Sequence, residues 1–201
     1  MRTIGVLLFP EFELLDVFGP LEMFGMLDEF EIRLVAERER SVASTQGPRS
    51  VIDDLFADDR AYDILLVPGG RGTRREVGNP QLLDWLKRKA AGAEYVASVC
   101  TGSALLARAG LLDGIAATSN KLAFDWVKSQ GPSVHWQSRA RWVEAGKFFT
   151  SSGVSAGMDM SLALIARICG EAQARQAATW AEYEWRNKPD DDPFAVEQAR
   201  A

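Results

Sequence analysis

The segment EYVASVCTGSALLARAGLL, residues 94–112, joins a strand-like run directly to a helix-like run. Cys100 stands on the bend, after the apolar run YVA and before the helix-forming run ALLA. A tight strand-to-helix turn that carries a nucleophile needs small neighbours, because the two backbones approach closely there. Ser98 and Gly102 supply them, two residues before and two residues after the cysteine. The segment therefore predicts an α/β fold with a cysteine at a strand-to-helix turn.

Other strand-like runs precede this segment and alternate with amphipathic stretches. Continuous apolar runs of this length are typical of strands that are buried on both faces of a parallel sheet. The clearest helix is NPQLLDWLKRKAAG, with Asn79 as N-cap, Pro80 at the first helical position and Gly92 at its end. The alternation predicts a doubly wound α/β sandwich with a mostly parallel central sheet and helices on both faces. The expected strands are Thr3–Phe9, Glu31–Ala36, Tyr62–Pro68 and residues 93–99.

The last third of the chain predicts a small hairpin and two helices. Residues 144–146, Glu-Ala-Gly, form the expected hairpin turn, because WV precedes them and FF follows shortly after. Helices are expected at Ser155–Ile168 and at about Glu171–Arg186, with Gly170 as a C-cap between them. The polar, proline-containing tail of about residues 187–201 is expected to lie along the surface.

Composition limits the possible functions. The 201 residues fit one domain, 1–201, and neither a repeat nor an interdomain linker interrupts them. A net charge of −5 argues against binding to nucleic-acid phosphates. No apolar stretch approaches the roughly 18 residues of a membrane span. We therefore expect no nucleic-acid or membrane partner.

Cysteine and histidine usage narrows the chemistry further. Two cysteines, Cys100 and Cys169, do not make a disulfide framework, and we expect a reduced, cytoplasmic protein. The chain has one histidine, His135, and no CxxC or HExxH pattern that would build a zinc site. Glycine-rich phosphate-binding motifs are absent as well. We expect neither a metal nor another cofactor.

Three candidate features fall at the carboxyl ends of predicted strands. Asp16 lies after the first, PGGRG (residues 68–72) after the third, and Cys100 after the fourth. Ligands of open α/β sheets bind beyond these ends, which meet at one edge of the sheet. We therefore expect the three features to converge.

Each feature has a functional and a structural interpretation. Helix N–H groups directed at Cys100 would lower its thiol pKa and favour the thiolate, although a buried structural cysteine is the alternative. The glycines of PGGRG would turn backbone N–H groups toward a ligand, or form a plain turn. A partly buried Asp16 would have a raised pKa, so that it stays protonated and donates a hydrogen bond to the sulfur, or else it would cap a helix. Cys169 is expected in the core, and His135 lies on a predicted strand rather than at a strand end that would suit a base.

Four segments together carry a resemblance to a known family. LLFPEFELLDVFGPLEMF, ILLVPGGRG, VASVCTGSALLARAGLLDG and FFTSSGVSAGMDMSLALIA occur in this order over nearly the whole chain. They resemble the ThiJ/PfpI superfamily of class I glutamine amidotransferase-like proteins. The resemblance implies a flavodoxin-like sandwich, commonly a homodimer, with a cysteine at a nucleophile elbow. The apolar run VFGPLEMFGML is a candidate dimer surface.

Within this superfamily the chain is most similar to the isocyanide hydratase group. This resemblance implies that Cys100 attacks the terminal carbon of an isocyanide, that Asp16 moves protons, and that water then releases an N-substituted formamide. It further implies that the backbone amides of Gly70 and Thr101 face the developing charge. Val154 falls where that group has an aliphatic residue lining the pocket.

One departure leaves the substrate open. Many relatives carry a histidine shortly after the elbow, where this chain has Asn120 in AATSN. A cofactor-independent glyoxalase or deglycase acting on dicarbonyls is one alternative, although that activity often uses the histidine. A non-enzymatic oxidation sensor or regulatory module is another, since a low-pKa thiol is readily oxidised. Related domains are fused to helix-turn-helix segments, and because none occurs here we do not expect direct DNA binding.

Overall fold

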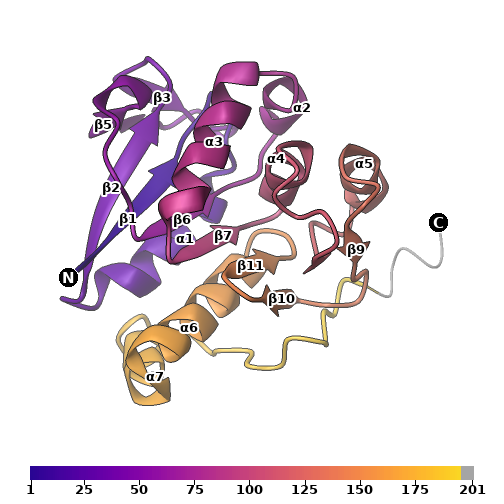
Figure 1. Cartoon of the computed structure of the whole chain (residues 1–201). Coiled ribbons are helices and arrows are strands. Elements are labelled where there is room, and N and C mark those ends of the chain that lie inside the picture. The colour runs from indigo at the N-terminus through magenta and orange to yellow at the C-terminus, as the bar shows by residue number, and fades with distance from the viewer. Residues whose placement is uncertain (196–201) are drawn as a thin grey trace.

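The computed structural model describes residues 1–195 and forms an α/β sandwich around a seven-stranded sheet (Figure 1). Part of the predicted tail, residues 196–201, lies outside the described residues. The strands are β1 (Arg2–Leu7), β2 (Phe30–Ala36), β3 (Ser41–Ala43), β4 (Arg49–Val51), β5 (Asp54–Leu55), β6 (Ile64–Val67), β7 (Tyr95–Ser98), β8 (Ala116–Ala117), β9 (His135–Trp136), β10 (Trp142–Ala145) and β11 (Phe148–Ser151). The helices are α1 (Leu14–Gly25), α2 (Thr73–Glu76), α3 (Pro80–Gly92), α4 (Gly102–Arg108), α5 (Phe124–Gln130), α6 (Ala156–Cys169) and α7 (Glu171–Trp180), with one 3₁₀ turn, η1 (Phe56–Asp58).

The central sheet has the strand order β10-β11-β7-β6-β1-β2-β5. All neighbouring pairs are parallel except β10 and β11, which form the predicted antiparallel hairpin at one edge. The chain runs outward from β1 to β2 in one direction and then from β6 to β7 in the other. This reversal places the carboxyl ends of β1 and β6 at the switch point where α/β proteins bind ligands.

Helices cover both faces of the sheet, as the sequence predicts. On one face α1 packs against α6, and α6 packs against α7; on the other, α4 packs against α3 and α5 (Figure 1). Strand β6 is buried along its whole length, and so are the last four residues of β1, which explains their unbroken apolar sequences. The predicted fold class is confirmed.

The predicted start of α3 is confirmed by its cap. The side chain of Asn79 accepts hydrogen bonds from the backbone N–H groups of Gln81 (3.1 Å) and Leu82 (3.3 Å). Among residues 1–195, no helix combines the length and hydrophobicity that crossing a lipid bilayer requires.

The last helix is shorter than expected, because the residues that would continue it bind a buried carboxylate instead. Helix α7 ends at Trp180 rather than near Arg186. Asp159 of α6 accepts hydrogen bonds from the Tyr183 hydroxyl (3.1 Å) and the Arg186 backbone N–H (2.9 Å). These tertiary contacts replace the helical hydrogen bonds that the sequence of residues 181–186 would otherwise support.

Candidate active site

Cys100 occupies a strained turn between β7 and α4. Its φ angle of 56° lies in the left-handed region, which a residue with a side chain adopts at a cost of about 1–3 kcal/mol. Hydrogen bonds hold the turn: the Cys100 N–H donates to the Ser152 carbonyl at 3.1 Å, and the Cys100 carbonyl accepts from the Ser119 hydroxyl at 2.8 Å. The cysteine is therefore presented in one fixed orientation.

The small residue after the elbow is required by the strand beside it. A Cβ atom built on Gly102 would overlap the carbonyl oxygen of Val67, the last residue of β6. This close approach of helix and strand is the reason the sequence has glycine two residues after the cysteine. The elbow geometry predicted from the sequence is confirmed.

Asp16 approaches the elbow from α1. The residue is fully buried, and its Oδ2 accepts a hydrogen bond of 2.8 Å from the Gly69 N–H. A Cβ atom on Gly69 would lie 2.6 Å from the Thr101 nitrogen and 2.9 Å from Asp16 Oδ2. Glycine is therefore the residue that lets the three strand ends meet, as the sequence predicted they would.

The pKa of the buried Asp16 carboxyl group lies near neutral pH. Burial raises the pKa of Asp16 to about 7, and the Gly69 N–H only partly opposes this effect. Cys100 and the Val154 backbone N–H also lower this pKa, but neither makes a hydrogen bond of ordinary length to Oδ1, which has no partner in the structure. At neutral pH the Asp16 carboxyl can therefore both take and give a proton.

The pKa of the Cys100 thiol is not lowered, although the position of this residue before a helix predicts that it would be. Burial, and then the charge of Asp16, raise the pKa of Cys100 well above its usual value. The Thr101 N–H does lower it, as the helix-terminus argument required, but burial outweighs this interaction. The expectation of a lowered thiol pKa was wrong, and the resting group is a neutral thiol beside a carboxyl group.

The two predicted amide donors, Gly70 and Thr101, lie close together, and the Gly70 N–H already makes a hydrogen bond. Gly70 has a φ of 122°, and its N–H donates to the Thr101 hydroxyl at 3.2 Å. The Thr73 hydroxyl lies 3.1 Å from the same oxygen. The Gly70 N–H is thus linked to Thr101 through its side chain, while the Thr101 backbone N–H points to the sulfur of Cys100.

The side chain of Asn120 lies near the Cys100 sulfur. Its Oδ1 accepts a hydrogen bond from the Ala123 N–H at 3.0 Å, and its Nδ2 lies so close to Gly153 that a Cβ there would overlap it. The amide lowers the pKa of Cys100 as a hydrogen-bond donor. The residue that departs from the histidine of many relatives therefore serves as a neutral donor to the thiol.

A pocket of about 250 Å³ lies next to the pair formed by Cys100 and Asp16, although neither of these two residues is part of its lining. Three of its lining residues adjoin that pair: the Asn120 amide lies near the Cys100 sulfur, Ser152 accepts from the Cys100 N–H, and Val154 directs its N–H toward Asp16. Val154 has a φ of 49°, unusual for a β-branched residue. Lys121, Leu122, Gly153, Ser155 and Phe194 complete the lining.

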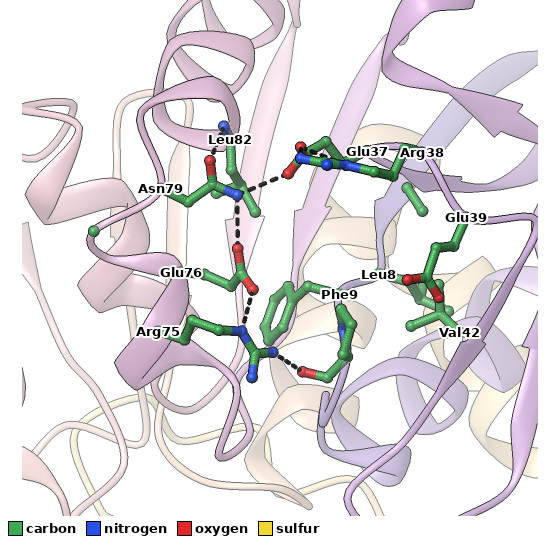
Figure 2. Close-up of a pocket in the computed structure, with 13 residues that line it drawn as sticks. Leu8, Phe9, Glu37, Arg38, Glu39, Val42, Arg75, Glu76, Asn79 and Leu82 are labelled. Carbon is green, nitrogen blue, oxygen red and sulfur yellow. Dashed lines mark hydrogen bonds and ion pairs between the residues drawn. The ribbon is translucent and has the colours of Figure 1, made fainter.

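A larger cavity, of about 420 Å³, lies beyond the ends of β1 and β2 (Figure 2). Asn79 Nδ2 donates to Glu37 at 2.7 Å and to Glu76 at 2.9 Å, and Arg75 bridges Glu76 to the Pro10 carbonyl (Figure 2). The polar groups of this wall hydrogen-bond to one another and therefore form a structural network. The network contains no nucleophile. In residues 1–195 no cluster of three His, Cys, Asp or Glu side chains could hold a metal ion.

The structure thus assembles all five site residues that the sequence singled out: Cys100, Asp16, Gly70, Thr101 and Val154. Sequence reasoning missed two partners of the pair. Gly69 was hidden in the PGG run, where either glycine could have supplied the N–H group. Ser119 gave no signal, because a hydroxyl that supports a carbonyl has no sequence pattern of its own. Histidine takes no part, since His135 is exposed on the small β8–β9 sheet.

Comparisons with known proteins give a consistent pattern of relatives. A model described as the DJ-1/PfpI family matches residues 2–167, a range that includes both members of the pair. The isonitrile hydratase of Pseudomonas putida is 35% identical over 180 residues, which cover 90% of this chain and 78% of that protein. The HTH-type transcriptional regulator GbdR of Pseudomonas aeruginosa is 31% identical, over 83% of this chain and 46% of the regulator. The crystal structure of a ThiJ/PfpI family protein from Pseudomonas syringae superimposes with a TM-score of 0.84 at 32% identity, covering 96% of this chain and 77% of that one.

Proposed function

The chain belongs to the DJ-1/PfpI family, and from this premise we propose that it is a cysteine-dependent hydratase that converts an isocyanide into an N-substituted formamide. The observation that carries the proposal is the pairing of Cys100 with a buried Asp16 whose pKa is raised to about 7. A carboxyl group that titrates near neutral pH can act as both general base and general acid in one cycle. The similarity to an isonitrile hydratase at 35% identity supports the same chemistry.

The first step forms a bond between sulfur and carbon. The Asp16 carboxylate takes the proton of the Cys100 thiol while the sulfur attacks the terminal carbon of the isocyanide. Asp16 then gives this proton to the same carbon. The product is a thioimidate, in which the carbon bears one hydrogen, one sulfur and a double bond to nitrogen. Because the thiol pKa is raised, attack requires this base, which explains why a carboxyl group lies beside the sulfur.

The second step uses water. Asp16 takes a proton from a water molecule whose oxygen adds to the thioimidate carbon, and the nitrogen receives that proton. The carbon–sulfur bond then breaks, and the hydroxyl proton of the adduct passes to the sulfur by way of Asp16. The products are the formamide and the neutral thiol. We expect the N–H groups of Thr101 and Gly70 to stabilise the negative charge that develops as water adds, the latter once the Thr101 hydroxyl turns away.

Asn120 suits this mechanism better than a mechanism that needs a second base. Its side-chain amide can donate a hydrogen bond but cannot accept a proton at neutral pH. The pair therefore depends on Asp16 alone for proton transfer. Dicarbonyl conversion, the main alternative, gains no such support, and methylglyoxal serves as the competing substrate in the test.

An oxidation sensor gains less support from the site. Oxidation proceeds through the thiolate, and sensor cysteines are exposed with low pKa values. Cys100 is 7% exposed, and its pKa is raised. Both properties slow the reaction of the sulfur with peroxide.

The test is turnover of an aryl isocyanide, followed by formamide formation. We expect turnover by the parent and by Cys169→Ser, and none by Cys100→Ser or Asp16→Asn. Cys169 is the matched control because it is the other free cysteine and lies at the end of α6, outside the site. Turnover of methylglyoxal but not of the isocyanide would overturn the proposal in favour of dicarbonyl chemistry.

The homodimer expected from the sequence stays a prediction, as do the cytoplasmic location and the absence of nucleic-acid and membrane partners. Leu15 and Phe18, on either side of Asp16 in the sequence, are 41% and 40% exposed on α1. A second copy of the chain would cover them. Light scattering of the parent and of Phe18→Glu measures whether this helix joins two copies.

A further inference from the structure

The tail after α7 is hydrogen-bonded to the start of β10, at one edge of the sheet. The Pro189 carbonyl accepts hydrogen bonds from the backbone N–H groups of Arg141 (2.6 Å) and Trp142 (3.3 Å), at the start of β10. The Asp192 N–H donates to the Arg139 carbonyl at 3.2 Å. These contacts fix the path of residues 189–192.

Asp192 anchors the tail in a buried cluster of charges. The residue is 3% exposed, and its carboxylate lies 3.7 Å from Arg141 Nη1 and 3.9 Å from Lys121 Nζ. Both cations are 3% exposed and have further partners: Arg141 pairs with Asp159 at 2.6 Å, and Lys121 donates to the Ala140 carbonyl at 2.6 Å. A buried carboxylate is tolerated when cations surround it, so this arrangement favours one position of the tail.

The anchored aspartate also orients the aromatic residue that follows. Asp192 Oδ1 accepts a hydrogen bond of 3.0 Å from the Phe194 N–H. Phe194 lines the pocket beside the reactive pair, together with Asn120 and Val154, and is 58% exposed. Phe194 therefore belongs to the lining of the pocket while more than half of the residue remains exposed to solvent.

We infer that Phe194 is a specificity-determining residue, which forms an apolar wall for the N-substituent of an aryl or bulky alkyl isocyanide, and that Asp192 positions this wall. The inference rests on the proposed function for the identity of the substrate. Val154, Leu122 and Phe194 supply three apolar side chains to the lining. A methyl substituent is too small to reach across such a pocket, whereas an aryl ring can pack against a second ring.

The test compares an aryl isocyanide with methyl isocyanide. For Phe194→Ala we expect KM for the aryl substrate to rise about tenfold, with kcat and the methyl kcat/KM within about twofold of the parent. Trp180→Ala is the matched control, because Trp180 is a similarly exposed aromatic residue (54%) on α7 outside the pocket lining. An unchanged ratio of aryl to methyl kcat/KM in Phe194→Ala would overturn the inference.

The positioning role of Asp192 has its own readout. Asp192→Ala removes the acceptor of the Phe194 N–H and should reproduce the tenfold rise in aryl KM with little change in kcat. Asp192→Asn keeps an acceptor oxygen and should restore most of the aryl preference. Thermal unfolding of each variant separates this effect from a loss of folding. If Asp192→Ala folds and keeps the parental ratio, the positioning role is wrong.

A second measurement works without catalysis and separates this inference from the proposed function. In a Cys169→Ser background, the rates at which iodoacetamide and N-phenylmaleimide modify Cys100 give a ratio of small to aryl reagent. Phe194→Ala should change this ratio by fivefold or more relative to the parent. If no isocyanide is turned over but the ratio changes, the proposed substrate is wrong and the wall is retained. If isocyanide is turned over and neither ratio changes, the wall is wrong.

Discussion

The Gly69 N–H donates a 2.8 Å hydrogen bond to Asp16 Oδ2 and thereby joins the loop after β6 to the helix after β1. Gly69→Ala would place a methyl group 2.6 Å from the Thr101 nitrogen and 2.9 Å from Asp16 Oδ2. The backbone would have to move, so we expect activity to fall at least 100-fold and stability to fall by about 1–3 kcal/mol. Steady-state kinetics and urea unfolding measure the two effects.

Gly92→Ala is the matched control for this substitution. It lies at the end of α3, where an added Cβ meets nothing within 4 Å. Activity should stay within twofold of the parent. If Gly69→Ala behaves like Gly92→Ala, the close approach of loop and helix does not control the site.

The thiol pKa provides a second prediction. Because burial and the Asp16 charge raise the pKa of Cys100, its alkylation by iodoacetamide should keep accelerating as pH rises above 9. Asp16→Asn removes the negative charge, so the pKa should fall and alkylation at pH 8 should become at least threefold faster. Mass spectrometry in a Cys169→Ser background measures the rates. An alkylation midpoint below pH 7 in the parent would show that the helix terminus dominates after all.

The sequence was sufficient to predict the architecture and most of the residues that converge at the candidate site. Apolar runs that alternate with amphipathic stretches predicted the parallel strands. The topology of such sheets brings Asp16, the PGG run and Cys100 to one edge. These inferences depend on local patterns and on general rules of chain connection. The family assignment rested on motifs in order, and it is confirmed.

The remaining features depend on contacts between distant segments. The raised pKa of Cys100 comes from burial, which residue types alone do not give and which outweighs the N–H groups at the start of the following helix. The early end of α7 comes from Asp159, which lies more than 20 positions before the residues it binds. The anchoring of the tail by Asp192 is of the same kind, because an aspartate in a polar segment is ordinarily solvated.

Asn120 provides a third prediction, since it both caps a turn and donates to the sulfur. Asn120→Ala removes a hydrogen bond that lowers the pKa of Cys100, so thiol alkylation at pH 8 should slow about threefold and turnover about tenfold. Loss of the hydrogen bond from the Ala123 N–H should lower stability by about 1 kcal/mol. Asn79→Ala is the control, because it also loses a cap but lies at α3. Equal alkylation rates in the parent and Asn120→Ala would contradict contact with the sulfur.

The ionisation of Asp16 predicts how stability depends on pH. Its pKa is about 7 in the folded chain, against 3.8 for the ordinary group, so the folded chain retains a proton that the unfolded chain has already released between these values. This group's contribution to the free energy of unfolding is therefore largest below about pH 4 and declines as pH rises toward 7. The total decline has an upper bound of about 4 kcal/mol.

Asp16→Asn removes this dependence while keeping an acceptor for the Gly69 N–H. The variant should be inactive, yet more stable than the parent, by little at pH 4 and by a few kcal/mol at pH 7 to 8, where the difference levels off. Urea unfolding of both proteins from pH 4 to pH 8 measures the difference. A difference that is constant over this range would mean that Asp16 ionises in the folded chain as it does in water. The carboxyl group would then lack the near-neutral pKa on which the proposed proton transfers depend.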